Sequence, residues 1–315
     1  MDIKTLHQIV AGFRPARLLH VACSLRVFSL LAGHDMSLEQ LAERCNAKPE
    51  MLEKLLIACS ALGLVEKRGG RYRNTGFADT WLVEGHPLCQ VEIIAHSAAL
   101  WDFWGGLENT VLRDDAPRPA PDRHRNFIMG MHNLAVTSRA KALAEHLDLH
   151  GRRRLVDVGG GPGTYSIALC RQFPELHAVI FDLPETVAIA RDVIAREGMQ
   201  ERVTVRAGSW DADDFGSGND AVLLSNVLHG HGSKAKMKLR KAFDALVPGG
   251  LLIVQDFLLN DEKTGPLVPA LFNIMLGAFS RPELFGLIEQ AGFAQPKVAA
   301  AGDDGGSSVV VAMRK

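Results

Sequence analysis

The chain has 315 residues, of which 47% are hydrophobic and 23% are charged, and its formal net charge is −1. This composition is typical of a soluble globular protein and excludes a wholly disordered or fibrous chain. The balanced charge gives no general attraction to nucleic acid or to a membrane surface, and the length predicts two domains, since one domain holds roughly 100 to 200 residues.

No stretch approaches the roughly 18 uninterrupted apolar residues of a membrane helix, and the first residues lack the apolar core and cleavage site of a signal peptide. We therefore expect a cytoplasmic location. The five cysteines are odd in number and scattered through apolar or helical patterns. They predict reduced, mostly buried thiols rather than a disulfide framework or a metal site.

Residues 1–113 form the first predicted domain, and its pattern is mainly helical. Apolar positions recur at intervals of three and four in residues 16–31 and 52–62. Ser37, followed three residues later by Gln40, predicts a capping box at the start of a short helix. Pro49 suits the first turn of the next helix.

The segment LVEKRGGRYRN (64–74) predicts two short strands around the turn Gly69-Gly70. Helix, turn, helix and a two-stranded wing give the outline of a winged helix. The basic residues that could touch phosphates are Lys67, Arg68, Arg71 and Arg73. Since the second helix, PEMLEKLLIACSALG, has few side chains suited to reading base edges, we favour a packing or dimerisation role over DNA binding.

Residues 114–150 are predicted to connect the two domains and to supply substrate-lining helices. Residues 114–125 hold three prolines and several charges, which predicts an exposed connection. A helical pattern over 127–147 follows and leads to the second domain.

Residues 151–315 alternate short apolar β-type runs with helical stretches, which predicts an α/β fold with a parallel sheet covered by helices on both faces. The predicted strands are 155–158, 179–181, 203–206, 221–224 and 251–254. A further strand at 309–313 is expected at the sheet edge.

The glycine-rich loop in LVDVGGGPGTYS places Gly159, Gly161 and Gly163 directly after a buried strand and before a helix. An open parallel sheet binds ligands at this point, because glycines let the backbone turn sharply and approach the ligand. The third glycine of the nicotinamide fingerprint is replaced by Thr164, so the loop by itself does not name the cofactor.

Two further positions lie at the same end of the predicted sheet. Asp182 ends the second strand about 20 residues after the loop, where an acidic side chain can accept hydrogen bonds from ribose hydroxyls. Gly208-Ser209-Trp210 follows the third strand, where Trp210 could stack on adenine while Ser209 bonds its edge. A surface role for Asp182 and core packing for Trp210 are the alternatives.

Five ordered motifs resemble the S-adenosylmethionine-dependent O-methyltransferases of the plant caffeate and acetylserotonin type and their bacterial natural-product relatives. They are VDVGGGPG (156–163), FDLP (181–184), NVLHG (226–230), LVPGG (246–250) and EQAGF (289–293). The resemblance covers nearly the whole chain. It implies a Rossmann-like methyltransferase domain, a winged-helix-like N-terminal domain that forms an intertwined homodimer, and S-adenosylmethionine as cofactor.

The predicted cofactor-binding residues combine the loop, the strand ends and the family motifs. They are Asp157, Gly159, Gly161, Gly163, Asp182, Leu183, Gly208, Ser209, Trp210 and Ser225. Ser225 stands where the family often has a lysine, four residues before the histidine of the NVLHG motif, so the cofactor's methionine end is expected to be held differently.

Methyl transfer to a hydroxyl requires a positioned nucleophile and removal of its proton, a task that suits histidine near neutral pH. The resemblance assigns the general base to His229 and one flanking acid to Asp256. The second acid is missing, because Ser280 occupies its position, and Glu283 is an alternative candidate. The family's Asp-Trp after the histidine is replaced by Gly230-His231.

The pair His229-x-His231 has no Cys, Asp or Glu beside it at ligand spacing, so no metal is predicted. A flat, apolar acceptor is expected instead from the aromatic and methionine residues of the bridging helices. These are Trp101, Phe103, Trp104, Phe127, Met131, His132, Phe272, Met275 and Phe279. The preferred set is Trp101, Phe127, Met131, His132 and Met275, and simple core packing is the alternative for each.

The leading hypothesis is therefore O-methylation of a small aromatic or polyketide-like acceptor. A second hypothesis keeps the cofactor but changes the chemistry, to methylation of carbon, nitrogen or sulfur or to decarboxylation or hydroxylation. A third, a winged-helix DNA-binding regulator, depends only on the basic wing.

Overall fold

The computed structural model describes residues 1–113, 124–302 and 307–315, which fall into two compact units, Met1–Leu134 and Ala135–Lys315. Their boundary lies within the predicted connecting segment 114–150. Most of the predicted exposed connection at 114–125 lies outside the described residues. Each unit has its own hydrophobic core. In the described ranges no helix is both long enough and apolar enough to cross a membrane.

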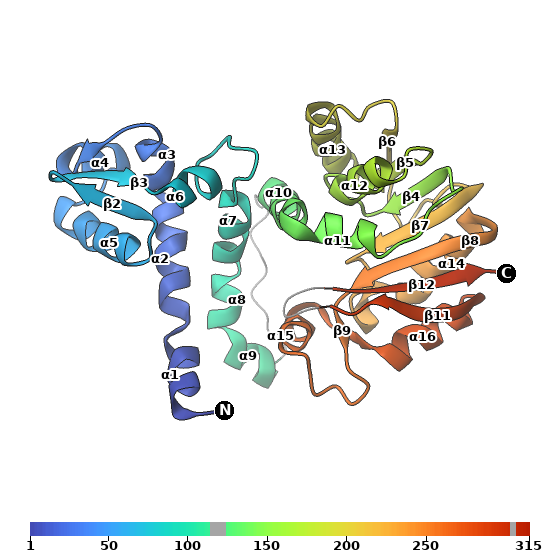
Figure 1. The fold of residues 1–315 in the computed structure, drawn as a ribbon. Helices are drawn as coiled ribbons and strands as arrows, with labels where there is room; N and C mark the ends of the chain where they lie inside the picture. Colours follow the sequence, from blue (N-terminus) through green and yellow to red (C-terminus); the bar gives the residue numbers. More distant parts are fainter. Residues whose placement is uncertain (114–123, 303–306) are drawn as a thin grey trace. The chain divides into compact units, whose positions relative to one another are not determined.

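The first unit is mainly helical with a small antiparallel sheet (Figure 1). Its elements are α1 (Ile3–Ala11), α2 (Phe13–Ser24), α3 (Val27–Leu31), β1 (Met36–Ser37), α4 (Leu38–Cys45), α5 (Pro49–Ala61), β2 (Val65–Arg68), β3 (Arg71–Asn74), α6 (Gly76–Trp81), α7 (Val91–Ala99), α8 (Trp101–Gly105), α9 (Leu107–Arg113) and α10 (His124–Leu134).

Local sequence signals account for several of these boundaries. The capping box that opens α4 is confirmed, because the Ser37 hydroxyl accepts from the Gln40 backbone N–H while the Gln40 side chain accepts from the Ser37 N–H. Pro49 begins α5 as predicted. The predicted helix 16–31 is interrupted, because Arg26 adopts a left-handed backbone conformation (φ 56°) between α2 and α3.

The predicted wing is present: β2 and β3 pair antiparallel, and β1 adds a third strand. Buried Phe28, Leu41, Leu56 and Tyr72 belong to the core beneath it. The four basic wing residues are all engaged within this unit. Lys67 pairs with Glu53, Arg68 and Arg73 pair with Glu66, and Arg71 donates to the Asp35 carbonyl.

The second unit is an α/β domain. Its elements are the π-helical turn η2 (Ala135–Arg139), α11 (Ala140–Glu145), β4 (Arg154–Val158), α12 (Thr164–Gln172), β5 (His177–Asp182), α13 (Pro184–Arg196), β6 (Val203–Ala207), β7 (Asn219–Ser225), the 3₁₀ turn η3 (His231–Ser233), α14 (Ala235–Ala245), β8 (Leu246–Asp256), β9 (Leu258–Leu259), α15 (Leu267–Leu276), β10 (Phe279–Ser280), α16 (Arg281–Gln290), β11 (Phe293–Ala300) and β12 (Ser308–Arg314).

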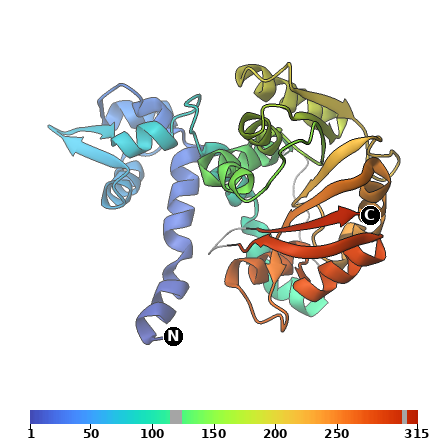
Figure 2. The ribbon, with the colours of Figure 1, turned by 45° about the vertical axis from the view of Figure 1, so that its right-hand side comes forward.

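The main sheet has the strand order β11-β12-β8-β7-β4-β5-β6. The pairs from β8 to β6 are parallel as predicted, but β12 runs antiparallel to both β8 and β11, so the sheet is mixed. The prediction that residues 309–313 form the edge strand is wrong. Figure 2 shows β11 and β12 side by side, with β11 outermost.

The edge strand β11 escaped prediction because its sequence, FAQPKVAA, is a weak strand signal. Pro296 cannot donate a ladder hydrogen bond, and Gln295 has a left-handed backbone (φ 53°). The pairing with β12 shifts register between Ala294 and Lys297 at this point. An edge strand tolerates such an interruption, since only one side of it must be paired.

The strands that follow β4 in the chain are placed first on one side of it, as β5 and β6, and then on the other, as β7 and β8. This change of side occurs at the centre of the sheet, where β4 lies between β5 and β7. Ligands bind outside the carboxyl ends of parallel strands at such a switch point. The apolar strands β4, β7 and β8 are covered on one face by α14 and α16, which contact each other, while α11 and α12 contact each other elsewhere in the unit. This arrangement brings the segments that follow β4, β5, β6, β7 and β8 to one edge.

The prediction of reduced, buried thiols is confirmed, because all five cysteines are free and buried. Burial raises the pKa of the Cys23 thiol to about 12 and that of the Cys59 thiol to about 11.

Candidate active site

The glycine loop after β4 is tied to the end of β5. The Gly161 N–H donates to Asp182 Oδ2 at 2.9 Å, and the Gly159 N–H donates to the Phe181 carbonyl at 2.8 Å. The other oxygen of Asp182 accepts from the Leu183 N–H at 2.7 Å. Because each carboxylate oxygen can accept more than one hydrogen bond, Asp182 keeps capacity for a ligand's hydroxyl groups.

Gly161 is the glycine of this loop that faces open space. Its φ is +55°, a conformation that glycine adopts easily, and a Cβ built there would meet no atom within 4 Å. By contrast, a Cβ on Gly163 would lie 2.3 Å from Ile180 Cδ1, and the φ of Gly163 is +81°, so glycine is favoured here mainly by its backbone conformation.

Asp157 lies beneath the same loop, fully buried on β4. A Cβ on Gly160 would lie 2.6 Å from its carboxyl carbon, so the loop packs directly on this group. Burial raises the pKa of Asp157 to about 7, against a hydrogen bond from Ser166, and nearby Asp182 raises it further. Within the described part of the chain Oδ1 has no hydrogen-bond partner.

Gly208, Ser209 and Trp210 follow β6 at the same edge. The Gly208 N–H donates to the Asp182 carbonyl at 2.9 Å, and the Ser209 N–H donates to Asp213 Oδ2 at 2.9 Å. The indole of Trp210 is half-buried, and its ring carbon Cζ3 would lie 3.1 Å from a Cβ on Gly159. The structure therefore brings the tryptophan and the glycine loop together.

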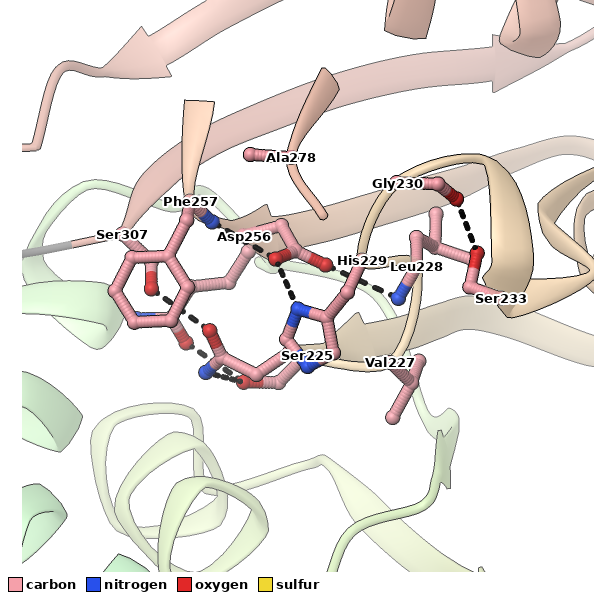
Figure 3. Close-up of polar contacts among 12 residues, drawn as sticks. Ser225, Val227, Leu228, His229, Gly230, Ser233, Asp256, Phe257, Ala278 and Ser307 are labelled. Atoms are coloured by element: carbon pink, nitrogen blue, oxygen red, sulfur yellow. Dashed lines mark hydrogen bonds and ion pairs between the residues drawn. The ribbon is translucent and has the colours of Figure 1, made fainter. Parts of the chain in front are cut away.

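His229 stands in the loop after β7 and is held by Asp256 at the end of β8. His229 Nδ1 lies 2.9 Å from Asp256 Oδ1 (Figure 3). The Phe257 N–H also donates to Oδ1 at 2.8 Å, while Oδ2 accepts from the Leu228 N–H at 3.0 Å. Asp256 is buried, and this set of donors compensates the carboxylate for the loss of water.

The imidazole of His229 is reachable, since its side chain is 21% exposed. A carboxylate only accepts hydrogen bonds, so the proton of a neutral imidazole belongs on Nδ1, and Nε2 is left with a lone pair. Among the described residues Nε2 has no hydrogen-bond partner. The ring centroids of His229 and Phe257 are 6.3 Å apart, and Phe272 of α15 stacks on Phe257 with a centroid distance of 4.0 Å.

Ser225 belongs to a polar chain beside the histidine loop. Its hydroxyl donates to Gln255 Oε1 at 3.0 Å and accepts from Asn226 Nδ2 at 3.3 Å, and the Ser307 hydroxyl donates to Asn226 Oδ1 at 2.8 Å. Figure 3 shows Ser225 and Ser307 in this chain. The serine that replaces the family's lysine is thus engaged with its neighbours, and its contact with a cofactor stays a prediction.

Ser280, which stands at the position of the missing acid, and Glu283, the candidate substitute for it, both cap the helix α16. They form a reciprocal capping box, with Glu283 Oε2 accepting from the Ser280 N–H at 2.9 Å. Glu283 also pairs with Lys263 at 2.6 Å and lies 3.7 Å from His231 Nε2. The hydrogen bond from Lys263, which is the largest cause, and those from Ser280 lower the pKa of Glu283 to about 2. No described contact joins Glu283 to His229.

The predicted acceptor residues divide between the two units. Trp101 packs near Phe13 and His20, and Phe127 packs against His96, all within the first unit. Met131 and His132 lie on α10 of that unit, while half-buried Met275 lies on α15 of the second. Their role in acceptor binding stays a prediction. Among the described residues no group of three metal-ligating side chains gathers.

Residues 115–294 match the O-methyltransferase domain family, and residues 7–84 match the O-methyltransferase dimerisation domain. The chain belongs to the S-adenosylmethionine-dependent O-methyltransferase family. The predicted fold class and the cofactor class are thereby confirmed, and the chain is an enzyme of this methyl-transferring type.

Individual relatives of this O-methyltransferase differ in the atom that they methylate. The 3-hydroxy-5-methyl-1-naphthoate 3-O-methyltransferase of Streptomyces sahachiroi is 35% identical over 98% of this chain and 94% of its own length. The L-tyrosine C(3)-methyltransferase of Streptomyces lavendulae is 27% identical, over 88% and 81%. The fold matches human N-acetylserotonin methyltransferase, solved with its methyl donor, with a TM-score of 0.85 at 24% identity over 100% and 98% of the two chains.

Sequence reasoning missed two features of this site. Lys238 is buried beside the histidine loop, although a lysine in the basic helix AKMKLRKAF carries no such signal. The capping box formed by Ser280 and Glu283 is the second, and the pattern Ser-x-x-Glu before an apolar run is the sequence signal that indicates it.

Proposed function

We propose that this enzyme methylates a hydroxyl group of a small aromatic acceptor, with His229 as the general base. The observation that carries the proposal is the 2.9 Å contact between His229 Nδ1 and Asp256 Oδ1. It orients the imidazole and assigns the proton to Nδ1, so that Nε2 is the atom available to accept a proton from the acceptor's hydroxyl.

S-adenosylmethionine, when bound, supplies the electrophilic methyl group. The residues at the strand ends fit it: Asp182 can accept from ribose hydroxyls, Gly161 borders open space, and Trp210 offers an indole surface. The buried Oδ1 of Asp157, which has no partner among the described residues, is a further polar atom that a bound group or a water could satisfy.

Asp256 does more than orient the base. When His229 takes the acceptor's proton, the imidazolium forms next to a carboxylate that is buried and held by two backbone N–H groups. The carboxylate stabilises this cation, because a charge pair interacts more strongly away from bulk water. The contacts therefore support proton removal at the hydroxyl with no second acid.

An aromatic acceptor is supported by the rings beside His229. Phe257 and Phe272 stack at 4.0 Å with an angle of 12° between their planes, and the imidazole is inclined by 26° to Phe257. Flat apolar surfaces of this kind suit a planar acceptor. The relative from Streptomyces sahachiroi is named for a hydroxynaphthoate, which has that shape.

A carbon acceptor is the second candidate. Removing the proton of a phenol creates a phenolate, whose negative charge is shared with the ring carbons next to the oxygen. The same base can therefore serve O- or C-methylation, and a relative named for C(3)-methylation of tyrosine favours keeping this candidate.

We propose that the enzyme is a homodimer assembled through the first unit. Helix α1 has no residue buried against the described part of the chain, and Ile9, Val10 and Phe13 are all more than half exposed. An amphipathic helix that leaves its apolar side uncovered is typical of an interface. These residues belong to the segment that matches the dimerisation domain, so the partner is a second copy of the chain.

The test uses the purified full-length enzyme with S-adenosylmethionine and 3-hydroxy-5-methyl-1-naphthoate as probe acceptor. A product heavier by one methyl group supports methyl transfer, and its fragmentation distinguishes the oxygen from a ring carbon. The variant His229→Gln should bind S-adenosylhomocysteine normally but lose about 100-fold or more in kcat. An unchanged kcat in this variant would remove His229 from the mechanism.

A further inference from the structure

Lys238 of α14 is a buried lysine, with 3% of its surface exposed. Taking an ammonium group out of water is costly unless it finds strong partners. Burial lowers the pKa of Lys238, while the carboxylates of Asp211 and Asp256 act in the opposite direction. The contacts of the ammonium must therefore offset its loss of hydration.

Among the described residues the Lys238 ammonium contacts two groups, and both belong to the candidate active site. Its Nζ donates to the Val227 carbonyl at 2.7 Å, two residues before His229. The same Nζ lies 3.9 Å from the centroid of the Trp210 ring. An ammonium at this distance is attracted to the electron-rich face of the indole.

The contact with Val227 completes the support of the histidine loop. Asp256 holds Leu228 through its N–H and His229 through its ring, while Lys238 holds the residue before them. These three consecutive residues lie outside regular helix and strand. They are held by two side chains, Asp256 of β8 and Lys238 of α14.

The contact with Trp210 determines which face of the indole is open to the cofactor. Since the ammonium lies over one face of the indole, a base could stack only on the opposite face. Trp210 and Val227 also meet at the glycine loop, where a Cβ on Gly159 would lie 3.1 Å from the indole and 2.7 Å from Val227. Lys238 thus contacts both residues that face this position of the first loop glycine, Trp210 and Val227.

We propose that Lys238 is a positioning residue that links the Trp210 platform for the cofactor to the loop that carries His229. Removing the ammonium while keeping the side-chain volume should then disturb both cofactor affinity and proton transfer. The catalytic half of this proposal rests on the proposed function of His229, whereas the cofactor half does not.

A purely structural role makes the opposite prediction. Replacing a buried charge by an apolar side chain of similar length is often neutral or stabilising, because the desolvation cost disappears. If Lys238 only fills space, Lys238→Met should fold well and bind cofactor normally. If it positions Trp210, the same variant should keep its thermal stability and lose affinity.

The first experiment measures binding of S-adenosylhomocysteine to the full-length protein by calorimetry. We expect Lys238→Met to weaken binding about tenfold, while Lys236→Met, on the exposed side of the same helix, binds as the wild type does. In a Trp210→Leu background the same substitution should change the affinity by less than about threefold, because the shared contact is already gone.

The proposal is overturned if Lys238→Met binds S-adenosylhomocysteine as tightly as the wild type, or if its effect is equally large with and without the indole. Should Lys238→Met fail to fold, Lys238→Arg replaces it in the test. Arginine keeps a cation over the ring, so a folded Lys238→Arg with wild-type affinity supports the proposal and one with about tenfold weaker binding contradicts it.

The second experiment measures kcat for the naphthoate probe at saturating cofactor. We expect Lys238→Met to lower kcat about tenfold in the wild type and to have little further effect in His229→Gln, since the positioned base is then absent. If His229→Gln alone leaves kcat unchanged, His229 is not the base. The role of Lys238 is then still tested by the binding measurements on Lys238→Met with and without Trp210→Leu. If the effects of Lys238→Met and Trp210→Leu on binding are additive, the positioning role of Lys238 is wrong, whatever the result for His229.

Discussion

Gly230 and Gly277 pack backbone against backbone: a Cβ at residue 230 would lie 2.7 Å from the Cα of Gly277. Gly230 has φ 50° and ψ −169°, a conformation essentially restricted to glycine. It directly follows His229, and Gly277 directly follows α15. The contact leaves no room for a side chain at residue 230 and places the histidine loop against the end of α15.

Gly230→Ala should therefore displace the histidine loop. The new methyl group would meet the Gly277 backbone and strain the residue-230 backbone, which costs roughly 1–3 kcal/mol in unfolding free energy. We expect kcat to fall about tenfold or more, since a small misplacement of a catalytic group is costly. Steady-state kinetics and denaturant unfolding measure both effects.

Gly232→Ala is the matched control for this substitution. A Cβ at residue 232 meets no atom within 4 Å, and its backbone is not left-handed. This variant should keep wild-type kcat and stability. Wild-type values in Gly230→Ala as well would show that the close contact between the two glycines is unimportant.

Asp256→Asn keeps the shape of the side chain and removes its negative charge. An amide has one accepting oxygen, so it cannot accept from His229 on one side and from the Leu228 N–H on the other. We expect kcat to fall about 100-fold or more while S-adenosylhomocysteine affinity stays close to the wild-type value. Asp261→Asn, at an exposed partner of Arg281, is the control and should be active.

The buried Asp157 makes stability depend on pH in a definite direction. Its pKa is about 7 in the folded chain and near 3.8 when unfolded, so the folded state binds more protons between these values. Stability should therefore fall as pH rises from about 4 to about 7 and then level off.

Asp157→Asn removes this dependence, because the amide does not ionise. Denaturant unfolding at pH 5 and pH 8 should show the variant gaining stability relative to the wild type at the higher pH. Asp192→Asn, an exposed position on α13, is the control. An identical stability difference at both pH values would contradict the raised pKa.

The exposed apolar residues of the first unit predict the oligomeric state. Ile9→Glu combined with Phe13→Glu should convert a dimer into monomers, because burying two carboxylates in an apolar interface is unfavourable. Sedimentation velocity checks the change. Val298→Glu, at a partly exposed position on β11, should leave the dimer intact. A wild-type monomer would contradict the proposed assembly.

The parallel core of the second unit could be predicted because β5, β7 and β8 each contain a continuous apolar run, which is typical of strands buried on both faces. The edge was less predictable. β11 contains a proline and a left-handed residue, so its strand character comes from pairing with β12 rather than from its own sequence.

In the candidate site, too, some features have a local sequence signal and others arise only from packing. The glycine loop and Asp182 carry local signals, and the histidine and its acid were assigned from the family resemblance. The burial of Lys238 and the contact between Gly230 and Gly277 join segments that are distant in sequence. Neither has a local pattern, because the environment of each residue is created only when α14 and α15 pack beside the histidine loop.

The most direct test of the central claim compares kcat/KM against pH for the wild type and His229→Gln with the naphthoate probe. If His229 removes the acceptor's proton, the wild-type rate levels off near neutral pH, where an imidazole can serve as base. The variant must instead wait for the acceptor to ionise by itself, so its rate keeps rising toward about pH 10, the usual pKa of a phenol, and the gap between the two closes. Parallel profiles with a constant gap at every pH would contradict general-base catalysis by His229.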